Sequence, residues 1–198
     1  VNGQINPGSG ERNAWVRMEA AGSVFVNRAV RATDRISITA GTGGHGNIIV
    51  NALSGNSGRL ETTLGSGPQQ RVELTTGTLS GGIAFDVATG LDPVVVAGND
   101  AAILLTATAG GMNQLAGFLR AVTLSVLARD GVNLRSAVDR ISNEVLLTGN
   151  LAAFTLVEED GLLIERIETN NGSVNITTLS GDLSVREIVT GSGAIQLT

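Results

Sequence analysis

Three aspartates near the middle of the chain carry the kind of side chain that acid–base chemistry needs. Asp86, Asp92 and Asp100 each lie near an expected turn. Carboxylates in pairs can act as acid and base on a polysaccharide, or hold calcium against a sugar acid. Nothing in the spacing brings these three together, and aromatic residues, which often line sugar clefts, make up only 3% of the chain. We therefore expect no enzyme, no catalytic residue and no cofactor.

The densest acidic run is Glu158-Glu159-Asp160, which ends at Gly161. Hard cations bind several carboxylate and carbonyl oxygens, so calcium binding is one interpretation of this run. The interpretation we favour is a solvated turn. Further acids follow at Glu165, Glu168, Asp182 and Glu187. We predict no metal site.

His45 and Trp15 are the single representatives of their residue types. A histidine can act as a general base, but the surrounding glycines of residues 43–47 predict an exposed turn without catalytic function. The same stretch is one weak copy of a calcium-binding Gly-Gly-x-Gly-x-Asp repeat, with Asn47 where the aspartate belongs. One copy cannot complete an oxygen shell, so this site is rejected. Trp15 is either a cap over the first layer or an assembly contact.

The composition limits the class of protein. The 198 residues include 27 glycines, three prolines and no cysteine, and 42% are hydrophobic. This predicts a folded chain with many tight turns and no disulfide or cysteine-ligated zinc. The formal net charge of −5 argues against nucleic-acid binding, which needs a basic surface. No apolar run is long enough for a transmembrane helix, so membrane insertion is not expected.

The elements expected are short strands. Apolar and polar residues alternate in brief runs such as 35–39, 59–64, 71–75, 82–87 and 173–177, separated by glycine-rich turns. Two strands with their turns take up roughly 22 residues, which is near the short end of solenoid repeat lengths. Eight or nine such coils would form a stack about 40 Å long.

The repeat is clearest between Asn171 and Thr198. Gly172-Ser173-Val174-Asn175-Ile176-Thr177, Gly181-Asp182-Leu183-Ser184-Val185 and Gly193-Ala194-Ile195-Gln196-Leu197-Thr198 share one cadence, and residues 22–39 repeat it. This cadence resembles that of filamentous-haemagglutinin-like adhesins and related giant bacterial surface proteins, over residues 22–109 and 143–198. The resemblance implies a right-handed parallel β-helix, export from a bacterium, and a role in adhesion, surface coating or matrix.

The middle of the chain departs from the cadence. Leu115, Phe118, Leu119 and Val122 have helical spacing, but we favour an irregular insertion in the region 110–143. Asp130-Gly131 and Asp160-Gly161 are also typical of tight hairpins. Two hairpins would favour an antiparallel β-sandwich, which is the alternative fold.

We therefore predict an all-β chain, residues 1–198, that forms a single elongated β-solenoid segment. Its expected function is that of a structural or adhesive segment at the cell surface or outside the cell, including self-assembly into a filament or layer. The expected partners are copies of itself, adjoining repeats of a longer chain, and host-surface or matrix glycans. The alternatives are a polysaccharide-acting β-helix enzyme and a fibre or pilus subunit joined by strand exchange.

Overall fold

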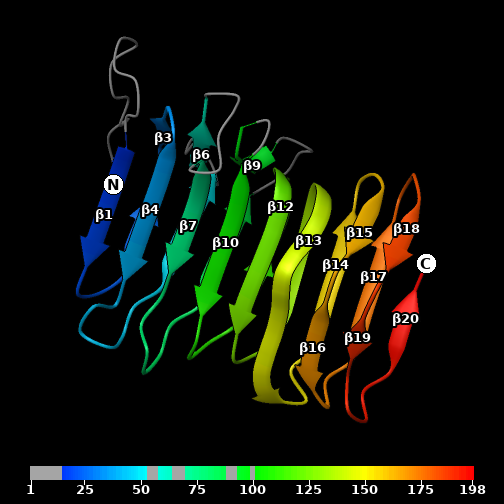
Figure 1. The fold of residues 1–198 in the computed structure, drawn as a ribbon. Helices are drawn as coiled ribbons and strands as arrows, with labels where there is room; N and C mark the ends of the chain where they lie inside the picture. The colour runs from blue at the N-terminus through cyan, green and yellow to red at the C-terminus, as the bar shows by residue number, and fades with distance from the viewer. Residues whose placement is uncertain (1–14, 53–57, 64–69, 88–92, 99–100) are drawn as a thin grey trace.

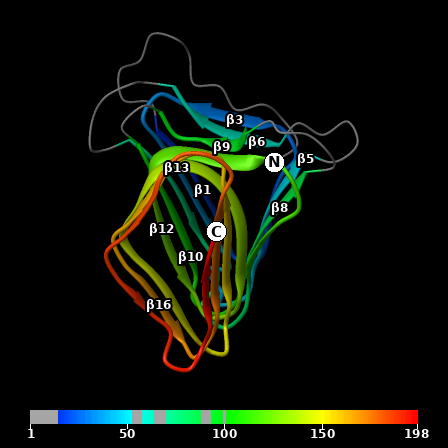
Figure 2. The same ribbon diagram turned by 90° about the vertical axis from the view of Figure 1, so that its right-hand side faces the viewer.

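The computed structural model describes residues 15–52, 58–63, 70–87, 93–98 and 101–198. The side chains of residues 52, 87 and 142–144 are not part of this description. The described chain winds into a stack of coils, each passing through three sides that we name faces A, B and C (Figures 1 and 2). Every strand pairing among the described residues is parallel. Each strand pairs with its equivalents one coil before and one coil after, except that strands of the first and last described coils pair on one side.

Twenty strands make up the three faces. Face A consists of β1 (Trp15–Ala20), β4 (Arg35–Ala40), β7 (Arg71–Thr75), β10 (Ala102–Ala107), the end of β12 (Phe118–Ala128), the end of β13 (Val132–Asn150), β16 (Ile167–Asn170) and β19 (Ile188–Val189). Face B consists of β2 (Val24–Val26), β5 (Ile48–Ala52), β8 (Ile83–Val87), β11 (Met112–Gln114), the start of β13, β14 (Phe154–Glu158), β17 (Val174–Thr178) and β20 (Ile195–Leu197). Face C consists of β3 (Ala29–Ala32), β6 (Arg59–Thr62), β9 (Pro93–Val96), the start of β12, the middle of β13, β15 (Leu162–Ile164) and β18 (Leu183–Val185).

The core follows directly from the alternation in the sequence. On β4 the inward residues Ile36 and Ile38 are buried, while Arg35 and Ser37 face outward. The parallel register then places the inward residues of successive coils on top of one another. One column of face A contains Ile38, Leu74, Leu105, Val126, Val145, Ile167 and Ile188. Small aliphatic side chains fill most of these layers, and Phe85 and Phe154 are the largest fully buried side chains among the described residues.

The coil has the predicted length but a different number of strands. In the C-terminal half, residues bonded across adjacent coils are 20 to 22 positions apart. Three strands, instead of the expected two, share this length. Some coils of the N-terminal half are longer, since Arg31 bonds Glu61 at a separation of 30 and His45 bonds Ser80 at a separation of 35.

The expected irregular insertion near residues 110–143 is wrong. Residues 112–114, 118–128 and 132–150 are strands, and β12 pairs with β13 from Leu119 to Ala128. These strands are long because they bend at the coil corners without leaving the extended conformation. The irregularities here are two register shifts, one between Phe118 and Leu119 against β9 and one between Leu124 and Val126 against β13. The residues with helical spacing form no helix: Leu115 lies between β11 and β12, and Phe118, Leu119 and Val122 lie on β12.

The antiparallel sandwich is excluded within the described residues, and neither aspartate–glycine pair forms a hairpin. Asp130-Gly131 joins β12 to β13, and the amide of Asp130 bonds the carbonyl of Gly110 in the preceding coil at 3.0 Å. Asp160-Gly161 is the corner between β14 and β15, which lie on different faces. Both pairs therefore turn the chain around a coil corner. The β-solenoid fold is confirmed.

Candidate functional site

A polar groove of about 510 Å³ lies over face C, and charged residues from several coils line it. It crosses from β6 over β9 and β12 to β13, and its far end lies at the corner after β14. The charged residues in its lining are Glu61, Arg120, Asp139 and Asp160. Its remaining lining consists mainly of small side chains and threonines, so an extended polar ligand fits it better than a compact apolar one.

The charges in the groove differ in their partners. Glu61 bonds Arg31 at 3.0 Å and lies 3.8 Å from Arg59. Within the described part of the chain, Arg120 and Asp139 form no ion pair. A guanidinium and a carboxylate that are not engaged with each other can both bind a polar ligand in the groove.

Of the three aspartates singled out in the sequence, the one that the structure describes, Asp86, does not line this groove. Asp86 lies on β8 of face B, with its neighbour Phe85 buried, so it faces outward on a different side of the coil. Asp92 and Asp100 lie outside the described residues. The groove instead uses Asp139 and Asp160, which are brought close to it by coils that follow much later in the sequence.

His45 joins two coils at the corner between faces A and B. Its Nδ1 lies 2.9 Å from Oγ of Ser80, and the two residues form an isolated parallel bridge. Asn47 acts similarly, because its Oδ1 accepts a bond of 2.8 Å from the amide of Gly82. The Gly43–Asn47 stretch therefore holds neighbouring coils together. Among the described residues there is no cluster of three or more metal-ligating side chains.

The acidic run Glu158-Glu159-Asp160 separates into three environments. Asp160 lines the groove, and Glu159 forms an ion pair with Arg135 of the preceding coil. Glu158 is 0% exposed, so the expected solvated turn is wrong for this residue. The later acids pair with arginines on the surface: Glu165 with Arg140 and Arg186, and Glu168 and Glu187 with Arg166. Asp182 lies in the corner before β18.

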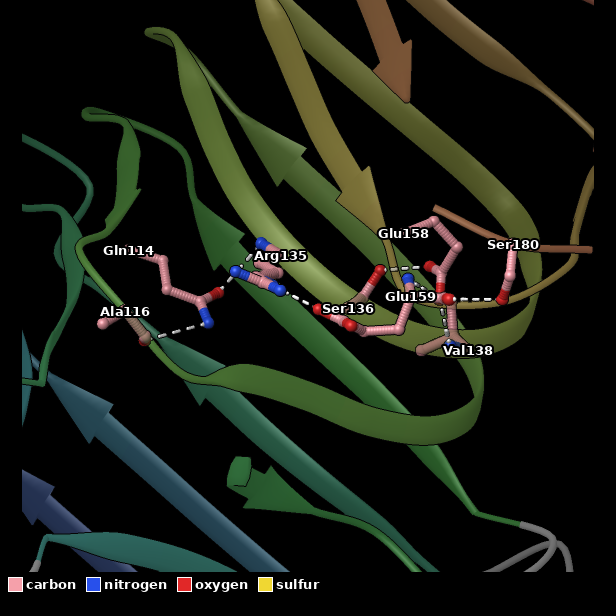
Figure 3. Close-up of polar contacts among 8 residues, drawn as sticks. All are labelled: Gln114, Ala116, Arg135, Ser136, Val138, Glu158, Glu159 and Ser180. Atoms are coloured by element: carbon pink, nitrogen blue, oxygen red, sulfur yellow. Dashed lines mark hydrogen bonds and ion pairs between the residues drawn. The ribbon is translucent and has the colours of Figure 1, made fainter. Parts of the chain in front are cut away.

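The Glu158 carboxyl group is held at the corner between faces B and C (Figure 3). Its Oε1 accepts hydrogen bonds from the backbone amides of Val138 at 3.0 Å and Glu159 at 3.1 Å. Its Oε2 lies in hydrogen-bond contact with Oγ of Ser136. Burial raises the pKa of Glu158 to about 7, although the bonds from Ser136 and Val138 oppose this rise. The nearby charge of Asp160 raises the pKa further.

The same corner contains polar residues in the neighbouring coils. Oε1 of Gln114 accepts a bond of 3.1 Å from the amide of Arg135, and its Nε2 donates to the carbonyl of Ala116 at 3.3 Å. Ser180 donates to the carbonyl of Glu159 at 2.9 Å. These side chains satisfy backbone groups where the chain leaves the sheet ladder. The sequence pattern indicates that Glu158 points inward, because it continues the alternation of the inward residues Phe154 and Leu156.

Trp15 is 51% exposed and does not cover the core. The guanidinium carbons of Arg17 and Arg35 lie 5.9 Å and 5.3 Å from the centre of its ring, within cation–π range. The expectation of a cap over the first layer is therefore wrong for its side chain. An assembly contact stays a prediction.

Fold and site together define a β-solenoid of three parallel sheets with a polar groove on one face. Comparisons of the chain with protein-family models, with curated proteins and with solved structures found no match. In the described residues, no helix is long and apolar enough to span a membrane.

Proposed function

We propose that this chain is a structural or adhesive segment of a protein at the cell surface or outside the cell. The observation that carries the proposal is the continuous coil-on-coil register on all three faces. Face B alone holds eight layers, from β2 to β20, with the same inward column throughout. A stack in which each layer shelters the next forms a stiff rod.

The surface of the stack supports a structural role. Several arginines and glutamates pair across neighbouring coils, as Arg35 does with Glu73 and Arg135 with Glu159. Such pairs contribute little stability one by one. They do neutralise the outward faces row by row, so that a long rod can lie against a matrix or another rod without strong repulsion.

The last coil provides the surface for further stacking. Its inward residues are apolar and partly or largely exposed: Leu183, Val185, Ile188, Ile195 and Leu197. The edge of each parallel sheet at this level also offers unpaired backbone groups. A coil of the same pattern, from the same polypeptide or from another copy, would bury both.

Electron microscopy of the native material tests the proposal. We expect rods, filaments or a surface layer with an axial repeat of about 4.8 Å between coils. Antibody labelling of intact cells tests the location and should detect the protein without permeabilisation. Isolated compact particles, or labelling only after permeabilisation, would contradict the proposal.

Self-stacking can be tested by paired substitutions on β20. Ile195→Asp places a charge on the inward side of the last coil and should abolish concentration-dependent association in sedimentation experiments. Gln196→Asp adds the same charge on the outward side of the same strand and is the matched control. Equal association of the two variants would exclude stacking through this surface.

The groove over face C favours one second candidate function, that of a polysaccharide-acting enzyme. Asp139 and Asp160 are the carboxylates that would serve as acid and base, and Arg120 would bind an anionic or hydroxyl group of the sugar. Release of new reducing ends from neutral or acidic polysaccharides measures this activity. It should disappear in Asp139→Asn and Asp160→Asn if the groove is an active site.

The described strands do not support the alternative of a fibre or pilus subunit joined by strand exchange. That hypothesis depended on an antiparallel sandwich completed by a strand from a neighbour. The described strands pair in parallel on every face, so the structural basis for this alternative is missing.

A further inference from the structure

The buried carboxyl group of Glu158 has a bonding pattern that differs between its two oxygens. Oε1 accepts from two backbone amides, those of Val138 and Glu159. Oε2 contacts only the hydroxyl group of Ser136, which is itself fully buried. A hydroxyl oxygen can accept as well as donate a hydrogen bond. Oγ of Ser136 can therefore donate to an ionised Oε2 or accept a bond from a protonated Oε2, so this contact is compatible with a neutral carboxylic acid that carries its proton on Oε2.

The ionised form would be a fully buried charge, because Glu158 is 0% exposed and forms no ion pair with the described residues. A buried carboxylate is stable when a cation accompanies it. Arg135, the nearest arginine on β13, already pairs with Glu159. Arg140 farther along β13 lies 3.7 Å from Glu165, so it too has its own partner.

The neighbours of Glu158 on β13, β14 and β17 other than these arginines add negative charge or none. Asp160, two residues after Glu158, disfavours a second negative charge. Asp139, next to the amide donor Val138, is also acidic. On the other side, β17 places the uncharged Thr178 beside Glu158. Arg120 on β12 pairs in register with Ala137 and lines the groove with Asp139 and Asp160, but it is exposed on the outward side of its strand. Among the described side chains of β12, β13, β14 and β17, none forms an ion pair with Glu158.

We propose that Glu158 is a proton-binding site that latches the corner between β14 and β15 when Oε2 carries a proton. Loss of the proton leaves an uncompensated charge inside the stack, which loosens this corner. Asp139 and Asp160 flank the latch and line the end of the groove on face C. The fit of the coils and the shape of the groove therefore change together with pH.

The sign of the effect follows from the two states of the chain. The folded state keeps its proton up to a pH of about 7, whereas an exposed glutamate loses it near 4.5. The contribution of the Glu158 proton to the free energy of unfolding is thus complete below about pH 4.5. It falls as the pH rises towards 7 and stays at its lower level above that. Between pH 5 and pH 8 the folding equilibrium constant should fall on the order of 10²-fold.

Denaturant unfolding of the full chain at pH 5 and pH 8 tests the latch. The variant Glu158→Gln keeps a neutral group of the same shape, with an amide that donates to Ser136. We expect it to lose most of the 10²-fold pH dependence of the wild type. Glu159→Gln removes a carboxylate one position away and should retain that dependence. Equal pH dependence in wild type and Glu158→Gln would overturn the proposal.

A second measurement keeps the test decisive if Glu158→Gln does not fold. The side-chain carboxyl carbon of Glu158 can be followed by NMR in the wild-type protein as the pH changes. A midpoint near 7 supports the latch. A midpoint at the ordinary glutamate value overturns it.

Discussion

Ile176 and Leu197 lie side by side in parallel register on face B, yet they differ sharply in exposure. Ile176 is 1% exposed, because coils lie on both sides of it, whereas Leu197 in the last described coil is 42% exposed. Strand type, register and side-chain size are nearly the same for Ile176 and Leu197. Comparing the two residues therefore measures how much one covering coil contributes to the free energy of unfolding.

Ile176→Ala should lower the free energy of unfolding by about 2–5 kcal/mol, as expected for a cavity in a packed core. Leu197→Ala should change it by no more than about 0.5 kcal/mol, as expected for an exposed site. Denaturant unfolding of dilute protein measures both. Similar losses for the two variants would mean that a further layer already covers Leu197 in solution.

Gly172→Ala should destabilise the chain by about 1–3 kcal/mol. A Cβ at this position would lie 1.8 Å from the carbonyl oxygen of Ala152 in the preceding coil. Because that oxygen belongs to the backbone, the coils must move apart. Gly22→Ala is the control, since no atom lies within 4 Å of the added carbon. Thermal unfolding should distinguish the two variants.

Leu151→Asn should stabilise the protein by about 1 kcal/mol. Leu151 has a φ of 62°, in the left-handed region, and its side chain is exposed. Asn171, at the same corner one coil later, has the same φ, and asparagine is a residue type that tolerates this conformation. Leu115→Asn changes an exposed leucine without positive φ and should bring no gain in unfolding free energy.

Asp160→Asn should lower the pKa of Glu158. The charge of Asp160 contributes to the raised value, so its removal makes ionisation of Glu158 easier. The NMR titration midpoint of Glu158 should move towards lower pH. Asp182→Asn, which neutralises an acid at the corner of the next coil, should leave the midpoint in place. A shift of equal size in both variants would indicate a general effect of net charge.

The alternation and the glycine spacing in the sequence were sufficient to predict the solenoid. Residues 35–39 and 173–177 alternate so regularly that the alternation alone assigns their inward and outward sides, and both are strands of the expected kind. The length of the C-terminal coils was also predictable. This information is local, because a period of two decides which side of a strand faces the core.

Three-dimensional stacking decided what local patterns could not. The number of strands in a coil depends on where the chain bends, and β13 bends at two corners without a break that its sequence would reveal. Ser136 and Val138, which bind the carboxyl group of Glu158, lie on a strand some 20 residues earlier in the chain. The acidic run by itself suggests a solvated turn and does not reveal that one of its carboxyl groups is buried. The sequence by itself therefore determined the faces of the strands. The tertiary structure alone determined which residues meet across the coils, because each contact depends on the length of the whole turn between them.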